Sequence, residues 1–235
     1  MSTQTLLRIS LPDGFTLYAS HFREMLAKLP GVPAALFHRD AEGKTFNERP
    51  GIRAVGGTGW VGLLADSEHA PLVTDVTGAA ILAVSTLVGR PCKVQMEHLN
   101  FGIKLDHSPQ TYWVREMAIK RKSPKARAQE VGSLIAERVL TSIEATCDKY
   151  GFDCPTSNQL EITTTEIVRE RGMNLETSTG LTGMFVHLVD AVVTVHADLS
   201  GMWFVGNLTA RGYGRLIQPR PGMRMEENRR GGVLK

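Results

Sequence analysis

The sequence predicts an α+β fold made of two ferredoxin-like (RRM-like) halves in tandem, with a glycine-rich loop near the C-terminus and a basic helical insertion. Three observations predict this class. Runs of branched or alternating apolar residues, typical of strands, occur in both halves of the 235-residue chain. Each half also contains a segment with apolar residues at helical spacing. The first half has the order strand, helix, strand, strand, which is how a ferredoxin-like unit begins.

The predicted N-terminal half covers residues 1–110. Residues 5–11 are rich in branched side chains and predict the first strand. From Thr16 the apolar residues recur at helical spacing until Pro30 and Gly31 stop the pattern, which predicts a helix with one buried face. Residues 70–88 are apolar and fit either a helix or a strand. Four further segments are predicted strands, with a hairpin turn between the second and the third: 34–38, 51–55, 60–64 and 92–98.

The predicted C-terminal half covers residues 111–218, and a basic tail follows at 219–235. Its helix is expected to begin at Ser123, because serine caps free N–H groups and the following proline fits the first turn, and to end at Tyr150. Val131, Leu134, Ile135, Val139 and Ile143 make its apolar stripe. Strands are predicted at three segments: 112–117, 158–164 and 185–196.

Composition narrows the class of protein. No apolar run approaches the roughly 20 residues that a membrane helix needs, and the first residues lack the layout of a secretory signal. We therefore expect a cytoplasmic protein with no membrane partner. The cysteines Cys92, Cys147 and Cys154 are odd in number and lack zinc-type spacing, so neither a disulfide framework nor a structural metal is expected. No cofactor is predicted.

Positive charge is concentrated in two blocks. Residues 115–127 contain six Lys or Arg against Glu116 alone, and residues 211–235 contain seven against two glutamates. Each block therefore has a local charge of +5, while residues 128–210 between them are acidic. Two separate basic blocks fit two contacts on a polyanion such as RNA. For either block alone, a solvated face or a loose tail is the competing interpretation.

The glycine-rich loop lies at residues 201–215. Closely spaced glycines let backbone N–H groups approach a phosphate chain, and Arg211 and Arg215 beside them supply charge. A second group of motifs precedes this loop: Leu36-Phe-His38-Arg-Asp, Arg49-Pro-Gly-Ile-Arg-Ala-Val-Gly-Gly, Trp60-Val-Gly-Leu-Leu, and Tyr112-Trp-Val-Arg-Glu-Met leading into the basic segment at Lys125.

Together these motifs resemble the CRISPR-associated repeat-RNA endoribonucleases, which cut precursor CRISPR RNA within its repeats. The resemblance covers roughly residues 34–217. In the loop, Asn207 stands where the family usually has lysine and Ala210 where it usually has serine. These departures indicate a divergent branch, and the arginine-rich helix is similar to the version found in type IV CRISPR systems.

The resemblance implies metal-independent cleavage, in which the ribose 2′-OH attacks the adjacent phosphate and leaves a 2′,3′-cyclic phosphate and a 5′-OH. His38 is the first candidate for general acid or base, because imidazole titrates near neutral pH. Arg39 and Arg23 are candidates for stabilising phosphate charge, and His21 and Tyr18 are further catalytic candidates. The competing interpretations are a structural histidine, solvated arginines and a core tyrosine. Without a histidine, arginines alone would give a slow enzyme.

The predicted RNA-binding residues fall into two sets. The first set would follow the phosphates of a repeat hairpin, whose A-form stem is recognised by shape: Arg115, Lys120, Arg121, Lys122, Lys125 and Arg127. The second set would hold the adjacent single strand: Gly206, Asn207, Arg211, Gly212, Tyr213, Gly214 and Arg215. Tyr213 either stacks on a base or packs inward.

Three functions therefore compete. The first is an endoribonuclease that matures CRISPR RNA and stays on the crRNA stem-loop with other subunits of an effector complex. The second is a catalytically inactive crRNA-binding subunit of such a complex. The third is a general RNA-binding protein unrelated to CRISPR.

Overall fold

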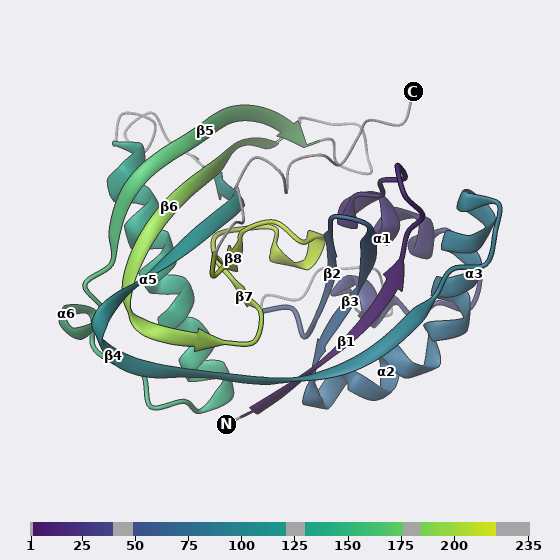
Figure 1. The fold of residues 1–235 in the computed structure, drawn as a ribbon, viewed down its shortest axis with the longest axis horizontal. Helices are drawn as coiled ribbons and strands as arrows, with labels where there is room; N and C mark the ends of the chain where they lie inside the picture. The colour runs from purple at the N-terminus through teal and green to yellow at the C-terminus, as the bar shows by residue number, and fades with distance from the viewer. Residues whose placement is uncertain (1, 40–48, 121–129, 176–183, 220–235) are drawn as a thin grey trace. The chain divides into compact units, whose positions relative to one another are not determined.

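The computed structural model describes residues 2–39, 49–120, 130–175 and 184–219. It confirms the predicted α+β class, with antiparallel strands and packed helices (Figure 1). The chain forms two compact units. Unit 1 contains Phe101–Thr209 and the chain from Tyr213, and unit 2 contains Ser2–Asn100 and Ala210–Gly212. The predicted boundary at residue 110 and the tandem ferredoxin-like arrangement stay predictions, and all but the first residue of the predicted tail lies outside the described residues.

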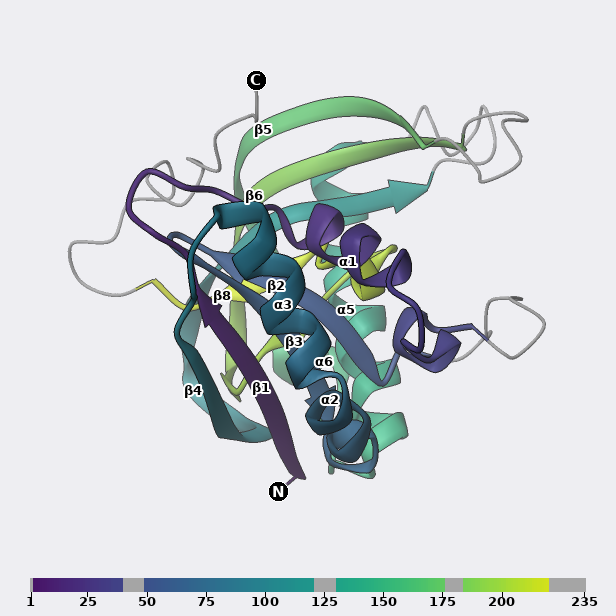
Figure 2. The same ribbon diagram turned by 90° about the vertical axis from the view of Figure 1, so that its right-hand side faces the viewer.

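Unit 2 is an antiparallel sheet with helices on one face. Its strand order is β2-β3-β1-β4, and Figure 2 shows the helices in front of the sheet. The strands are β1 (Ser2–Ser10), β2 (Ile52–Gly57), β3 (Trp60–Asp66) and the first part of β4 (Val94–Lys120). The helices are α1 (Ala19–Ala27), η1 (Ala34–Phe37), η2 (Ser67–His69), α2 (Ala70–Asp75) and α3 (Thr77–Val88).

The core of unit 2 follows from strand alternation and one helical stripe. Val61, Leu63 and Ala65 point from β3 to the helices, where Phe22 and Leu26 of α1 are fully buried. The predicted first helix and hairpin are thereby confirmed, and residues 70–88 are helical. Among the described residues no single helix is long and apolar enough to cross a membrane, although the bent pair Ser67–Asp75 and Thr77–Val88 passes that test of length and composition together.

The predicted strand at 34–38 is wrong. Residues Ala34–Phe37 form the 3-10 helix η1, and His38 follows in the left-handed region with φ 60°. Leu36 and Phe37 are consecutive and both buried in the same core. A strand would place them on opposite faces, whereas a 3-10 turn lets both side chains reach that core.

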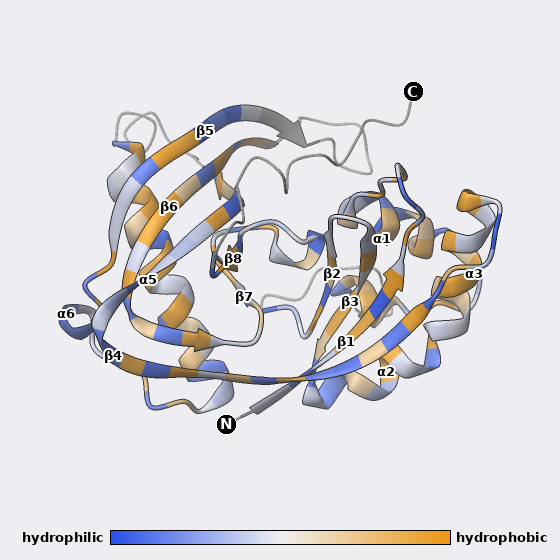
Figure 3. Cartoon of the chain, viewed as in Figure 1, coloured by the Kyte–Doolittle hydropathy of each residue, from blue (hydrophilic) through white to orange (hydrophobic). Residues whose placement is uncertain are grey.

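Unit 1 is built on the strand order β4-β6-β5, with β8 paired to β4 and to β7. The elements are α5 (Val131–Tyr150), α6 (Ser157–Leu160), β5 (Thr163–Leu175), β6 (Met184–Ser200), β7 (Trp203–Phe204), η3 (Thr209–Arg211) and β8 (Arg215–Ile217). Alternate residues of β6 from Val189 to Leu199 face the α5 stripe in one core. Figure 3 shows this alternation as changing colours along β6.

The predicted boundaries of three strands differ from the structure. The strand expected at 92–98 begins only at Val94, and it and the strand expected at 112–117 are parts of the single long strand β4, which begins in unit 2. The strand expected at 158–164 is wrong at its start, because Thr156 and Gln159 form a capping box that begins the short helix α6. The predicted helix start at Ser123 lies outside the described residues, and α5 begins at Val131 after Glu130, whose ψ of 134° is not helical.

Candidate functional site

Three arginines of unit 2 lie around one pocket of about 390 Å³. Arg23 comes from α1, Arg39 follows His38 at the end of η1, and Arg211 belongs to the Ala210–Gly212 segment of the glycine-rich loop. The rest of the lining is mixed, with one carboxylate, one hydroxyl and an apolar wall: Glu24, Ser20, Ala27, Val32, Ala34 and Phe37. The pocket thus combines a concentrated positive charge with a partly apolar lining.

Helix α1 supplies one side of the pocket by simple periodicity. Ser20, Arg23, Glu24 and Ala27 are spaced i, i+3, i+4 and i+7, so they share one face of the helix. Phe22 and the other core residues occupy a different face. One face of this short helix therefore packs in the core, and another face lines the pocket.

Arg23 is held in place by η1. Its Nη2 donates a hydrogen bond of 2.7 Å to the carbonyl of Phe37, and its guanidinium carbon lies 5.3 Å from the centre of the Phe37 ring. Burial and, to a smaller extent, the nearby positive charges of Arg211 and Arg39 lower the pKa of Arg23 to about 10, against the opposing effect of Glu24. Arg23 is still protonated at neutral pH. A bound anion would relieve the repulsion among these cations.

The other catalytic candidates lie near this pocket in sequence without lining it. His38 is half-buried between Phe37 and Arg39, and its left-handed backbone ends η1. His21 is exposed on α1, and its ring meets the Tyr18 ring edge to face, with centroids 5.7 Å apart. The arginines therefore converge, whereas the lining residues that the structure describes include no histidine or tyrosine.

The glycine-rich loop is tied to the protein by its own backbone. The Gly206 N–H donates to Ser142 Oγ on α5 at 3.0 Å, and the Gly214 N–H points at the carbonyls of Arg115 and Glu116, at 3.0 and 3.2 Å. These two N–H groups are thus engaged within the protein rather than directed at a ligand.

Close packing explains why glycine is needed at Gly212 and Gly214. Both have positive φ, 85° and 77°. A Cβ at Gly212 would lie 2.6 Å from the Ala54 carbonyl oxygen, and one at Gly214 would lie 1.8 Å from that of Val205. These two glycines allow the backbone of the loop to pass close to neighbouring backbone. Arg211, which precedes Gly212, lines the pocket.

Asn207 and Tyr213 also make contacts within unit 1. The Asn207 side-chain oxygen accepts from the Lys120 N–H at 3.2 Å, and its own N–H donates to the Ala118 carbonyl at 2.9 Å. Tyr213 is partly buried and packs on a small cluster that contains Ala118. This favours the inward orientation of the tyrosine. Contact of either residue with RNA stays a prediction.

Two predicted RNA-binding arginines lie opposite each other in unit 1. Arg115 of β4 and Arg215 of β8 are paired in register, and both are half-buried. Like charges directly opposite on a sheet repel each other. Contact of either arginine with RNA stays a prediction. Lys120 ends β4 and is half-buried. The remaining predicted residues Arg121, Lys122, Lys125 and Arg127 lie outside the described residues.

A second pocket, in unit 1, has the wrong chemistry for a phosphate. It measures about 560 Å³, and the residues of known placement that line it include two carboxylates and no lysine or arginine: Ala136, Glu137, Leu140, Ser157, Asn158, Glu161, Ile162 and Thr163. Over the described ranges, no group of three His, Cys, Asp or Glu residues is arranged to hold a metal ion.

Sequence reasoning missed part of the arginine pocket. Ser20 and Glu24 could have been found, because they are three before and one after Arg23 on the same helical face. Arg211 was predicted to bind RNA but not to join Arg23 and Arg39, because no local pattern links residues so far apart along the chain.

Comparison with solved structures finds proteins of similar fold. One structure, described as Csf5, the type IV CRISPR-Cas crRNA endonuclease of the Cas6 kind, is 34% identical over 93% of this chain and 100% of its own, with a TM-score of 0.82. Two Cas6b structures are 13% and 12% identical, cover 92% of this chain and 100% of their own, and have TM-scores of 0.64 and 0.54, so they support the fold alone.

No curated protein matches this chain significantly by sequence. The model of a protein family, the type IV CRISPR-associated endonuclease Csf5, matches residues 1–221. That match covers almost the whole chain and agrees with the structural likeness to a protein of the same description. The chain therefore belongs to the Csf5 family of type IV CRISPR-associated endonucleases.

Proposed function

We propose that this protein is a metal-independent endoribonuclease that cleaves precursor CRISPR RNA within the repeat and stays bound to the crRNA hairpin in an effector complex. The observation that carries the proposal is the convergence of Arg23, Arg39 and Arg211 on one pocket. Membership of a family named for CRISPR endonucleases gives that pocket a substrate class. We propose that the protein acts in the cytoplasm and that its partners are crRNA and other subunits of the complex.

The pocket fits the charge changes of the reaction. The 2′-oxygen forms a bond to phosphorus, the bond to the 5′-oxygen breaks, and negative charge builds on the non-bridging oxygens between those events. Guanidinium groups bind such oxygens through paired N–H donors. Arg23 has five N–H donors, of which the Phe37 carbonyl engages one, and its partial burial strengthens its interaction with an anion.

The proton transfers need a separate assignment. A base must take the 2′ proton and an acid must supply one to the 5′-oxygen. His38 is our first choice, because it sits between the pocket residues Phe37 and Arg39 in the chain. If His38 does not act, the arginines alone would orient the 2′-OH and stabilise the charge, and turnover would be slow.

The second candidate is a catalytically inactive crRNA-binding subunit. The observation in its favour is that His38, His21 and Tyr18 are not among the residues that line the pocket. Arginines without an acid or base can bind a phosphate and leave it intact.

One experiment separates the two. The purified protein is incubated with its repeat RNA in EDTA, and the products are resolved on a gel and analysed at their ends. One discrete cut with a 2′,3′-cyclic phosphate supports the metal-independent enzyme. Intact RNA that remains bound supports the inactive subunit, and equal affinity for unrelated hairpins would favour a general RNA-binding protein.

A further inference from the structure

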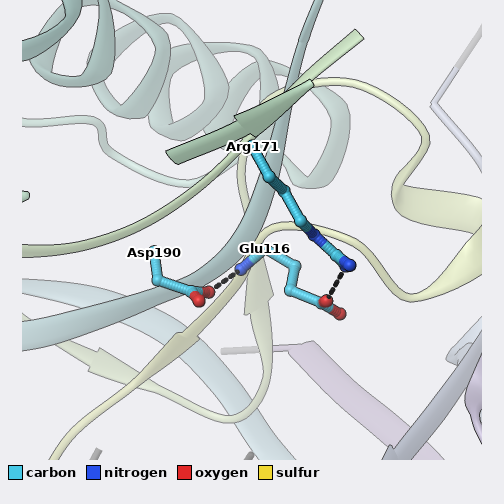
Figure 4. Close-up of polar contacts among 3 residues, drawn as sticks. All are labelled: Glu116, Arg171 and Asp190. Carbon is cyan, nitrogen blue, oxygen red and sulfur yellow. Dashed lines mark hydrogen bonds and ion pairs between the residues drawn. The ribbon is translucent and has the colours of Figure 1, made fainter. Parts of the chain in front are cut away.

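We infer that Asp190 is a positioning residue for the glycine-rich loop, acting through Glu116 and Gly214. This inference rests on the proposed function, because it links Asp190 to the reaction through the loop that carries Arg211. Figure 4 shows the contacts of Glu116 with Asp190 and Arg171, from which the link to the loop starts.

Strand β4 has a β-bulge opposite Asp190. The β4–β6 ladder pairs Val114 with Ala191 and Met117 with Val189, so two β4 residues, Arg115 and Glu116, lie opposite the single residue Asp190. Glu116 has φ 48°, which places it in the left-handed region. A glutamate adopts that conformation at a cost, and neighbouring groups must hold it there.

Asp190 and Arg171 supply that hold. Asp190 is 8% exposed, and its Oδ1 accepts a hydrogen bond of 2.7 Å from the Glu116 N–H. The Arg171 guanidinium pairs with the Glu116 carboxylate. Figure 4 shows the two contacts reaching Glu116 from different sides, one at its backbone and one at its side chain. The buried aspartate thus stabilises the bulge, and the more exposed arginine supports it.

The bulge in turn fixes the loop. The carbonyls of Arg115 and Glu116 both accept from the Gly214 N–H, and the Gly214 carbonyl accepts from the Val205 N–H at 2.8 Å. Gly214 is therefore held between the bulge and Val205. Arg211 lies three residues before Gly214 in the chain. Loss of Asp190 would free the bulge, loosen Gly214 and widen the range of positions open to Arg211.

The test compares Asp190→Ala with Asp198→Ala, an exposed aspartate on the same strand, in the full chain. Amide exchange is followed at Gly214, and repeat-RNA cleavage is measured under single turnover together with Kd. We expect Asp190→Ala to speed exchange at Gly214 and to slow cleavage by about tenfold or more, with Kd changed less than about threefold. Asp198→Ala should behave as wild type.

Rescue distinguishes positioning from general destabilisation. In the Asp190→Ala background, Glu116→Gly should restore protection and rate, because glycine adopts the left-handed conformation without help. Glu116→Ala removes the same carboxylate and should not restore them. The inference is overturned if Asp190→Ala leaves exchange at Gly214 unchanged, or if the alanine rescues as well as the glycine.

Two further outcomes have defined meanings. If Asp190→Ala fails to fold by circular dichroism, Asp190→Asn takes its place, since the weaker amide acceptor should still speed exchange at Gly214, and unchanged exchange contradicts the inference. If wild-type protein neither binds nor cleaves repeat RNA, the proposed function fails, while exchange at Gly214 still decides whether Asp190 controls the loop.

Discussion

Arg23 is subject to three effects in the pocket: burial, repulsion by two other arginines, and contacts with Phe37. Burial and two neighbouring guanidinium groups lower its pKa to about 10, yet the Phe37 carbonyl and ring keep the charged group in place. Without an anion, this arrangement costs stability because the folded state binds the proton less tightly than the unfolded chain. With a phosphate bound, the same charges become favourable.

Replacing the pocket arginines should slow the reaction strongly. We expect Arg23→Ala, Arg39→Ala and Arg211→Ala each to lower the single-turnover rate by about 10² to 10³-fold, because each removes charge stabilisation from the transition state. Arg23→Lys should recover little, since lysine lacks the planar fork of donors. Arg90→Ala, at an exposed arginine of the same unit, is the matched control. Normal rates in the three pocket variants would refute the proposed site.

The role of His38 has its own test. We expect His38→Ala to slow cleavage with little loss of RNA binding, because the imidazole acts on protons rather than on phosphate charge. Cleavage at the wild-type rate by His38→Ala would remove this residue from the mechanism.

At the scale of elements, sequence periodicity predicted what depends on local pattern. The stripe of α5 and the hairpin of β2 and β3 were visible because their apolar residues recur at fixed spacing. The errors at 34–38 and 158–164 arose where a 3-10 turn or a capping box overrode strand-like composition. The pocket was only half predictable, because Arg211 reaches Arg23 through the path of the glycine-rich loop, which no local spacing encodes.

The basic segment that follows β4 in the sequence, with Lys122, Lys125 and Arg127, is predicted to bind the RNA stem. Reversal of Lys122, Lys125 and Arg127 to glutamate should weaken binding strongly and flatten its dependence on salt, because fewer counterions are released. Reversal of three exposed basic residues of unit 2, Lys28, Arg90 and Lys93, is the control for net charge. Unchanged affinity in the first variant would mean that the segment is only a solvated surface.

At the scale of the whole molecule, an anion in the pocket should stabilise the fold. We expect inorganic phosphate at about five times its Kd to raise the free energy of unfolding by about 1 kcal/mol, because it binds the folded state alone. Arg211→Gln should remove most of this gain, compared at equal ionic strength with chloride. Thermal melting with and without phosphate measures both. Equal gains for the two proteins would show that phosphate acts elsewhere.

The path of the chain through its two units has a consequence for natural variation. The glycine-rich loop leaves unit 1 after Thr209, gives Ala210–Gly212 to unit 2 and returns at Tyr213. Gly212 must meet Ala54 and Gly214 must meet Val205, with only Tyr213 between them. An insertion or deletion of one residue here would move another residue into one of these positions, where the Ala54 or Val205 carbonyl leaves no room for a Cβ. Substitutions at Ala210 leave both glycines in place. We therefore expect family members to differ in the amino acids at the other positions of this loop more often than in the length of the loop.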